Sequence, residues 1–352
     1  MTISKEGVGL ATSQKIALDV HAHLVPIVLD RLLAMEGANW KDDRELLEVD
    51  GHLVGIPDLY KPHALIAWMD QNDIEKAWIS IPPPLYRQQL NAASARKWAD
   101  YLNDGLVTIC TDHPDRLAPL FHLPIEHPSV AIAIATDRRS RGARGFAMAA
   151  GGSATPVYSD PVLDPLWNEL SASNCFVFIH PGSCCDGRLK AFYLENLVGN
   201  PYETAVAAAH LVFGGVCERF PRVKFCLAHA GGATAMIAGR LQHGFGTGRV
   251  GIDISKESPE KILKRFHVDC IVHDNAALHY VANTFGEDRV LFGSDWPFPM
   301  GVLAPHRHLA SLENALQHKL FWENPYALRE EYRAQNISAE NSLQTISPKM
   351  SD

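Results

Sequence analysis

Two histidines near the start of the chain are spaced so that they could bind one metal ion. The apolar run of residues 15–20 leads directly into His21-Ala22-His23. Because side chains alternate along a strand, both imidazoles would leave it on the same face. With 17 histidines in 352 residues, about one such spacing is expected by chance, and a second pair, His306 and His308, has no comparable context. The first pair therefore needs further ligands at the ends of other strands.

Three more polar side chains come directly after later apolar runs, namely His180, His229 and Asp295. If those runs are neighbouring strands, four imidazoles and one carboxylate meet at one edge. Such a mixture of nitrogen and oxygen ligands suits Zn²⁺ or Mn²⁺ better than Ca²⁺ or Mg²⁺. Each residue alone has a structural explanation, such as Asp295 capping a turn. The prediction of a metal site therefore depends on the whole set.

The elements that must position these residues are short apolar runs alternating with helical patterns. This alternation is typical of repeated βα units. Eight repeats predict an α/β fold, a TIM-like (β/α)8 barrel with its functional residues at the carboxyl ends of the strands. The eight expected strands are residues 16–20, 77–81, 117–122, 143–147, 175–179, 223–228, 268–272 and 290–293.

The barrel is expected to span residues 15–334. A polar, glycine-containing insertion at residues 35–60 follows the first strand, and a loop of this length in a compact domain is usually functional. We expect it to lie over the barrel mouth. Residues 1–14 are expected to form a flexible lead, and residues 335–352 a mobile tail.

Composition limits the class of protein. Hydrophobic residues make up 47% and charged residues 20% of the chain, which is typical of an ordinary globular protein. A net charge of −8 argues against a nucleic-acid partner, and no apolar run is long enough to span a membrane. The seven cysteines are scattered without a CxxC pair, and the first residues lack a secretion signal. A cytoplasmic enzyme is the expectation.

The motifs together resemble the amidohydrolase superfamily, in particular its aminocarboxymuconate-semialdehyde decarboxylase-like branch. They occur in the family's order from about residue 16 to 330. The matching segments are DVHAH at 19–23, FIHP at 178–181, NPYET at 200–204, FGGV at 213–216, RFP at 219–221, LAHAGG at 227–232 and GSDWPFP at 293–299.

This resemblance implies roles for individual residues. His21, His23, His180 and Asp295 would bind one divalent metal, with Zn²⁺ as first choice and Mn²⁺ as the alternative. His229 would act as acid/base together with Asp295. The fourth strand ends without the lysine that binuclear members carboxylate, which agrees with a mononuclear branch. A homodimer is also implied.

The implied activity is metal-dependent, non-oxidative decarboxylation of a small planar oxygenated carboxylate, either hydroxybenzoate-like or a ring-cleavage product of aromatic catabolism. The alternative is a hydrolase or hydratase that uses a metal-activated hydroxide on a lactone, an amide or a vinylogous C–C bond. A catalytically silent metal barrel that only binds ligands is a third possibility, against which His229 and Asp295 argue.

Substrate-binding residues are less clearly indicated. In the namesake enzymes the insertion carries an arginine for a substrate carboxylate, whereas residues 50–57 contain none here. The candidate cations are Arg188, which is favoured, and Arg87 and Arg249. His52 could replace the missing arginine, and Trp296 and Trp40 could stack on a planar ring. Glu203 would lie behind the metal ligands or contact the substrate.

Overall fold

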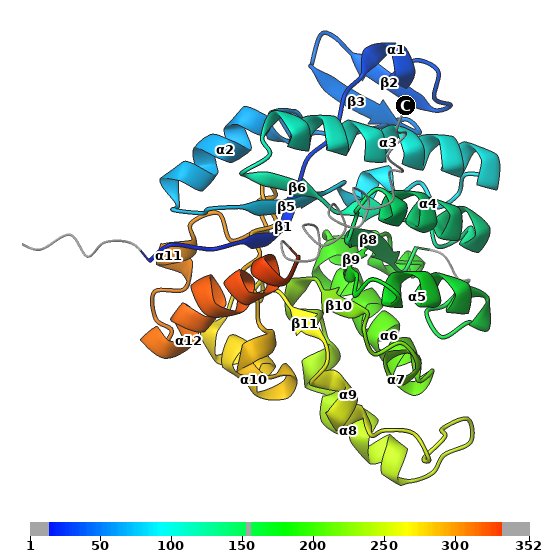
Figure 1. Ribbon diagram of the computed structural model, residues 1–352, viewed down its shortest axis with the longest axis vertical. Coiled ribbons are helices and arrows are strands. Elements are labelled where there is room, and N and C mark those ends of the chain that lie inside the picture. The colour runs from blue at the N-terminus through cyan, green and yellow to red at the C-terminus, as the bar shows by residue number, and fades with distance from the viewer. Residues whose placement is uncertain (1–13, 153–155, 333–352) are drawn as a thin grey trace, which may run out of the picture.

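The computed structural model describes residues 14–152 and 156–332. The expected lead (apart from Gln14) and the expected tail at 335–352 lie outside the described residues. Figure 1 shows the strands at the centre of the molecule with helices around them. The predicted α/β barrel architecture is confirmed by this arrangement and by the structural comparisons given below.

Parallel strands make up seven positions of the barrel. The third position is divided at Leu120, so that its first part pairs with the second strand and its second part with the fourth. The strands are β1 (Asp19–His23), β5 (Ala77–Ser80), β6 (Leu117–Pro119), β7 (Phe121–His122), β8 (Gly145–Ala150), β9 (Phe176–Pro181), β10 (Lys224–Leu227) and β11 (His267–Val268).

The eighth position is irregular and differs from the prediction. Residues 290–296 form isolated bridges rather than the expected strand. The segment nevertheless bonds to both neighbours, since Leu291 N donates to Val268 O (2.8 Å) and Val20 N donates to Phe292 O (3.0 Å). The expected strand 268–272 is likewise shortened to β11. The reason is that Ile271 N bonds to the side chain of Asp269 (3.1 Å) instead of to a neighbouring strand.

The helices begin where the sequence supplies suitable first residues. Proline stands in the first turn of α2 and α4, where its missing N–H costs nothing. Asn91 caps α3 by accepting from Ala93 N and Ser94 N (3.1 and 3.0 Å). Among the described helices, none combines the length and apolarity needed to cross a bilayer. The helices are α1 (Leu29–Leu32), α2 (Pro62–Gln71), α3 (Ala92–Asp112), α4 (Pro128–Ser140), α5 (Asp164–Ser171), α6 (Asn200–Phe213), α7 (Val216–Arg219), α8 (Thr234–Gly246), α9 (Pro259–Leu263), α10 (Asn275–Phe285), α11 (Pro305–His308) and α12 (Asn314–His318).

Two apolar clusters hold the barrel together. The inner one consists of side chains that the strands direct into the barrel, including Leu18, Trp78, Leu120 and Phe176. The larger one packs the outer faces of the strands against the helices. A filled interior is the normal state of such barrels, so chemistry is left to the strand ends.

The insertion after β1 forms its own small antiparallel sheet of β2 (Ala38–Lys41), β3 (Leu46–Val49) and β4 (His52–Leu53). In Figure 1 it lies beside α3, and Ser94 Oγ of that helix donates to Glu36 Oε2 in the insertion (3.5 Å). Asp50 accepts two bonds from Arg87 (2.6 and 2.8 Å). These contacts fix the insertion to α3 and to the segment that precedes it. Its position over the barrel mouth stays a prediction.

Candidate metal centre

The sequence predicted His21 and His23 just beyond the end of the first strand. In the structure both residues lie within β1. Their side chains project from the same face, and the two Nε2 atoms are 3.1 Å apart. Both residues are completely buried. β1 therefore presents two nitrogen atoms at one point inside the barrel.

His180 and Asp295 complete the cluster, and their side chains are also buried. Asp295 Oδ1 lies 3.3 Å from His21 Nε2 and 3.2 Å from His23 Nε2. One ligand atom from each of the four residues lies within 4.8 Å of the others. Tetrahedral ligands at metal–nitrogen distances of about 2.0–2.1 Å are about 3.3 Å apart. The residues predicted as metal ligands are thus brought together at a spacing that fits one ion.

The unpartnered nitrogen of His180 supports this fit. Its Nδ1 contacts Pro181 O (2.9 Å), whereas its Nε2 is buried with no hydrogen-bond partner among the described residues. Buried polar atoms are rarely left without a partner. A cation bound by Nε2 satisfies this atom.

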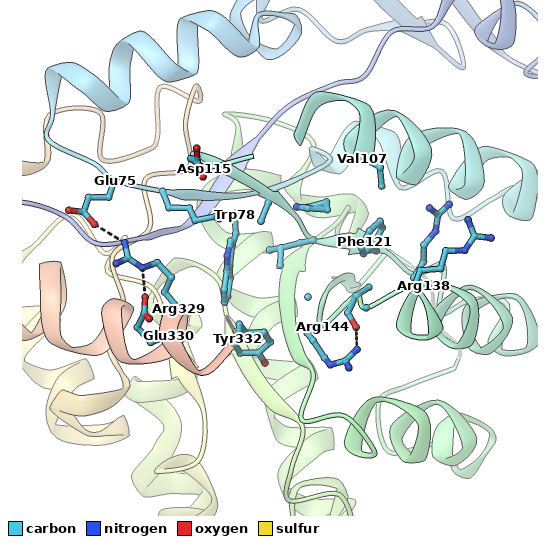
Figure 2. A pocket seen from close by; sticks show the side chains of 18 residues that line it. Glu75, Trp78, Val107, Asp115, Phe121, Arg138, Arg144, Arg329, Glu330 and Tyr332 are labelled. Carbon is cyan, nitrogen blue, oxygen red and sulfur yellow. Dashed lines mark hydrogen bonds and ion pairs between the residues drawn. The ribbon is translucent and has the colours of Figure 1, made fainter. Parts of the chain in front are cut away.

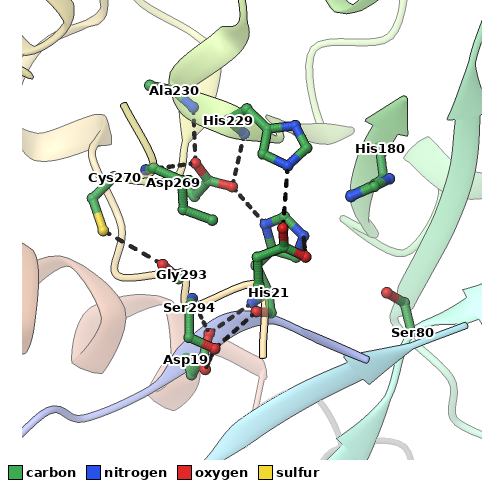
Figure 3. Close-up of polar contacts among 12 residues, drawn as sticks. Asp19, His21, Ser80, His180, His229, Ala230, Asp269, Cys270, Gly293 and Ser294 are labelled. Carbon is green, nitrogen blue, oxygen red and sulfur yellow. Dashed lines mark hydrogen bonds and ion pairs between the residues drawn. The ribbon is translucent and has the colours of Figure 1, made fainter. Parts of the chain in front are cut away.

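Asp269 is an essential neighbour that the sequence prediction missed. Its Oδ2 accepts from His21 Nδ1 (2.7 Å) and His229 N (2.9 Å), and its Oδ1 accepts from Ala230 N (2.8 Å) and Ile271 N (3.1 Å). Figure 3 shows this carboxylate between His21 and the backbone of the 229–230 turn. Such a bond fixes the ring and tautomer of a metal-binding histidine. In the sequence, this role was indicated by a single carboxylate within the otherwise apolar run 268–272.

Other buried groups hold the remaining ligands. Ser80 Oγ contacts His23 Nδ1 (3.2 Å). Asp19 accepts from His21 N (2.9 Å) and from Ser294 N (3.0 Å), which ties β1 to the segment carrying Asp295. Gly293 must be glycine, because a Cβ there would lie 2.9 Å from His21 Cβ and 2.8 Å from Asp269 Cβ.

The electrostatics of the cluster favour a cation. Burial and the neighbouring imidazoles hold the pKa of His180 well below its usual value, so that it stays neutral. Burial opposes protonation of His21 as well, but the Asp295 and Asp269 carboxylates outweigh it and raise its pKa to about 10. A metal ion would compete with the proton that His21 holds at this raised pKa, because an imidazole that binds a metal must be neutral.

His229 lies at the edge of this cluster. It follows β10, and its Nε2 is 3.6 Å from Asp295 Oδ2. Its side chain is 18% exposed, against 8% for Asp295 and 0% for His21 and His23, so it has the most access to solvent. His229 and Asp295 both adopt left-handed backbone angles (φ 54° and 57°), a conformation that is uncommon for such residues and often marks functional sites.

The contacts described for Arg87 and Arg188, two of the three arginines considered for a substrate carboxylate, are with residues outside the cluster. Arg188 is 89% exposed and pairs with Asp186 in its own loop (Nε to Oδ1, 2.9 Å). Arg249 is exposed. Arg87 is buried, but its guanidinium is engaged by Asp50 and lies 4.9 Å above the ring of Trp98. The expectation that Arg188 leads these candidates stays a prediction.

The other residues predicted to contact the substrate lie on different elements, and their role stays a prediction. His52 is exposed on β4. Trp40 packs on Tyr60 of the insertion (ring centroids 5.5 Å apart). Trp296 is buried next to Asp295, with its ring 6.5 Å from that of Trp68. Glu203 of α6 is buried and lines a small cavity of about 50 Å³.

A much larger cavity, of about 900 Å³, lies at the opposite end of the barrel. Figure 2 shows its lining, which includes Trp78, Arg144, Arg329 and Tyr332. Residues that precede or begin the strands surround it, such as Arg144 just before β8. In barrels of this type that end serves stability rather than catalysis, so volume alone does not locate the active site.

Comparison with known proteins agrees with the fold. Residues 18–328 match the amidohydrolase family. The chain belongs to the amidohydrolase family. The family predicted from the motifs is thereby confirmed.

Several decarboxylases resemble the chain over most of their length. It is 28% identical over 320 residues to the 2-amino-3-carboxymuconate-6-semialdehyde decarboxylase of Dictyostelium discoideum, covering 85% of this chain and 87% of that protein. It is 25% identical over 303 residues to the gamma-resorcylate decarboxylase of a Rhizobium species, covering 81% and 88%. Among solved structures, 5-carboxyvanillate decarboxylase from Sphingomonas paucimobilis superposes with a TM-score of 0.74 at 21% identity, covering 88% and 97%. The last likeness establishes the fold.

Proposed function

We propose that this amidohydrolase is a metal-dependent, non-oxidative decarboxylase of a small oxygenated carboxylate, either aromatic or derived from ring cleavage. The observation that carries the proposal is the buried cluster of His21, His23, His180 and Asp295, with His229 beside it. The curated relatives compared above are decarboxylases, which supports this reaction over the hydrolase alternative.

One divalent ion per chain is the cofactor that the cluster would hold. Three imidazoles and one carboxylate suit Zn²⁺ and also Mn²⁺. Manganese is bound in the similar 5-carboxyvanillate decarboxylase of Novosphingobium aromaticivorans, so we propose Mn²⁺ and Zn²⁺ as the two ions to test. A bound divalent ion supplies Lewis acidity, which polarises a substrate oxygen and stabilises negative charge.

The chain's own residues would move the proton. In decarboxylation a proton is added to the carbon that carries the carboxylate, the bond from that carbon to the carboxylate breaks, and CO₂ leaves. His229 is the group for this transfer, because its Nε2 borders Asp295 and its side chain has access to solvent. Asp295 would orient the ring of His229 while it helps to hold the metal.

An assay for released CO₂ tests this proposal. The metal-free protein, and the protein loaded with Mn²⁺ or Zn²⁺, would be incubated with 2,6-dihydroxybenzoate, 5-carboxyvanillate and 2-amino-3-carboxymuconate-6-semialdehyde. We expect metal-dependent CO₂ release from at least one acid. If instead ¹⁸O from water enters a product, with no CO₂ released, the hydrolase alternative is correct. The expected homodimer and cytoplasmic location remain predictions.

A further inference from the structure

Tyr86 and His122 form a stacked pair at the metal-bearing end of the barrel. Tyr86 follows the short helix η2 (Pro83–Leu85) beyond β5, and His122 ends β7. Their rings are nearly parallel (4°), with centroids 5.4 Å apart. The ring of Tyr86 also lies edge-on to the metal-site residue His180, at 6.4 Å. The pair therefore stands beside the cluster, although no step described so far uses it.

Each residue of the pair has a buried polar atom without a partner. Tyr86 Oη and His122 Nδ1 are inaccessible to solvent and accept or donate no hydrogen bond within the described residues. Such atoms are rare in folded proteins and call for a missing partner. The main chain of His122 is fixed, since Asn103 Oδ1 accepts from His122 N (2.7 Å) and Asn103 Nδ2 donates to His122 O (3.0 Å).

The neighbouring strand offers nothing polar to satisfy these atoms. β8 places Ala147 in register with His122, and Ala149 in register with His180. Gly182 lies against Tyr86, where a Cβ would be 3.4 Å from Tyr86 Cδ2. This wall of the barrel end therefore consists of small apolar residues around two unpartnered polar atoms.

Both groups are uncharged at neutral pH. A phenol such as that of Tyr86 is uncharged at neutral pH by its ordinary pKa, and burial lowers the pKa of His122 to about 3. A phenol and a neutral imidazole can each donate or accept, which matches a hydroxyl or a carbonyl oxygen. A second carboxylate would need a cation, and Arg87, which follows Tyr86 in the chain, is engaged by Asp50.

On the basis of the proposed decarboxylase function, we propose that Tyr86 and His122 bind an uncharged oxygen substituent of the substrate. The substrate class that follows is a monocarboxylate with at least one hydroxyl or carbonyl group, rather than a dicarboxylate. Tyr86 and His122 are then residues that determine specificity, while the metal ligands and His229 serve the reacting carboxylate.

Ligand binding to the metal-loaded protein tests this inference without requiring turnover. Calorimetry would measure the dissociation constants of benzoate, the three monohydroxybenzoates and isophthalate for wild type, Tyr86→Phe and His122→Phe. His267→Phe is the matched control, because His267 is also buried with an unpartnered Nδ1 but lies next to Lys224 and Arg289 instead. Metal content is measured for every variant.

We expect Tyr86→Phe and His122→Phe each to raise the dissociation constant of at least one hydroxybenzoate about 10-fold, because one hydrogen bond is lost and its buried partner is left unsatisfied. The affinity for benzoate and the metal content should be unchanged. His267→Phe should leave all five affinities unchanged. A parallel loss for benzoate and the hydroxybenzoates, or no loss at all, would overturn the role of the pair. Tighter binding of isophthalate than of any hydroxybenzoate would overturn the monocarboxylate class. Absence of CO₂ release would count against the proposed reaction alone, because these affinities do not depend on it.

Discussion

Replacing Asp269 with asparagine should weaken metal binding without removing any ligand. Each oxygen of this carboxylate accepts two bonds, one pair from His21 Nδ1 and His229 N, the other from Ala230 N and Ile271 N. An amide group in place of either oxygen would turn its N–H toward two donors. No rotation of the asparagine side chain avoids this conflict, and the charge that orients His21 is lost.

The magnitude follows from that geometry. Loss of an outer partner of a metal-binding histidine typically lowers metal affinity about 10- to 100-fold, which corresponds to about 1.4 to 2.7 kcal/mol. This range overlaps the roughly 1.5–3 kcal/mol attributed to a hydrogen bond with a charged group. We therefore expect Asp269→Asn to bind Mn²⁺ or Zn²⁺ 10- to 100-fold more weakly, and to recover activity when metal is saturating.

A competition titration against a chromophoric chelator measures this affinity directly. The control is Asp274→Ala, which removes the cap that accepts from Ala277 N (2.8 Å) at the start of α10. It should cost about 1 kcal/mol of folding stability and leave metal affinity unchanged. If Asp269→Asn binds metal as tightly as wild type, then the bond to His21 does not orient this ligand and the reasoning is wrong.

Three further outcomes are expected. His180→Ala should abolish metal binding, whereas His229→Ala should keep the metal and lose activity by about 10²- to 10⁴-fold; equal metal loss in both would make His229 a ligand. Gly293→Ala should reduce metal content, because its Cβ would displace His21 or Asp269, and elemental analysis would detect this. Burial lowers the pKa of His267 to about 3, so the folded protein holds this imidazole unprotonated. Its contribution to the free energy of unfolding is therefore complete above about pH 6.5 and declines as the pH falls. Denaturant unfolding at pH 7.5 and 5.5 should show a pH-dependent loss about 1.4 kcal/mol smaller in His267→Gln than in wild type; an unchanged difference would contradict it.

The sequence was sufficient to predict the barrel and the four clustered residues, because both depend on local patterns. Apolar runs define strands, and a polar residue at the end of a strand marks the functional face. His21 and His23 needed only the period of a strand to be placed together. The same pattern indicated His180, His229 and Asp295, and the family resemblance then implied an acid/base role for His229 and metal binding for the other residues.

The rest depends on contacts between distant segments. Asp269 is joined to His21 across 248 positions, which no local pattern encodes, and its bond to Ile271 N is also what shortens β11. Arg87 and Arg188, of which the sequence favoured Arg188, each pair with a carboxylate in the fold. The stacking of Tyr86 on His122 likewise requires the β5 and β7 ends to be adjacent.

The pairing of Asp50 with Arg87 gives the insertion an influence on a site that it is not seen to touch. Arg87 directly follows Tyr86, and its side chain is only 2% exposed beneath Asp50. Gly37 packs against the same pair, where a Cβ would lie 2.4 Å from Asp50 Oδ1. Changes in this peripheral sheet during evolution could therefore alter the position of Tyr86 beside the cluster while leaving every barrel strand intact. Substrate range and catalytic chemistry would then be inherited through separate parts of the chain.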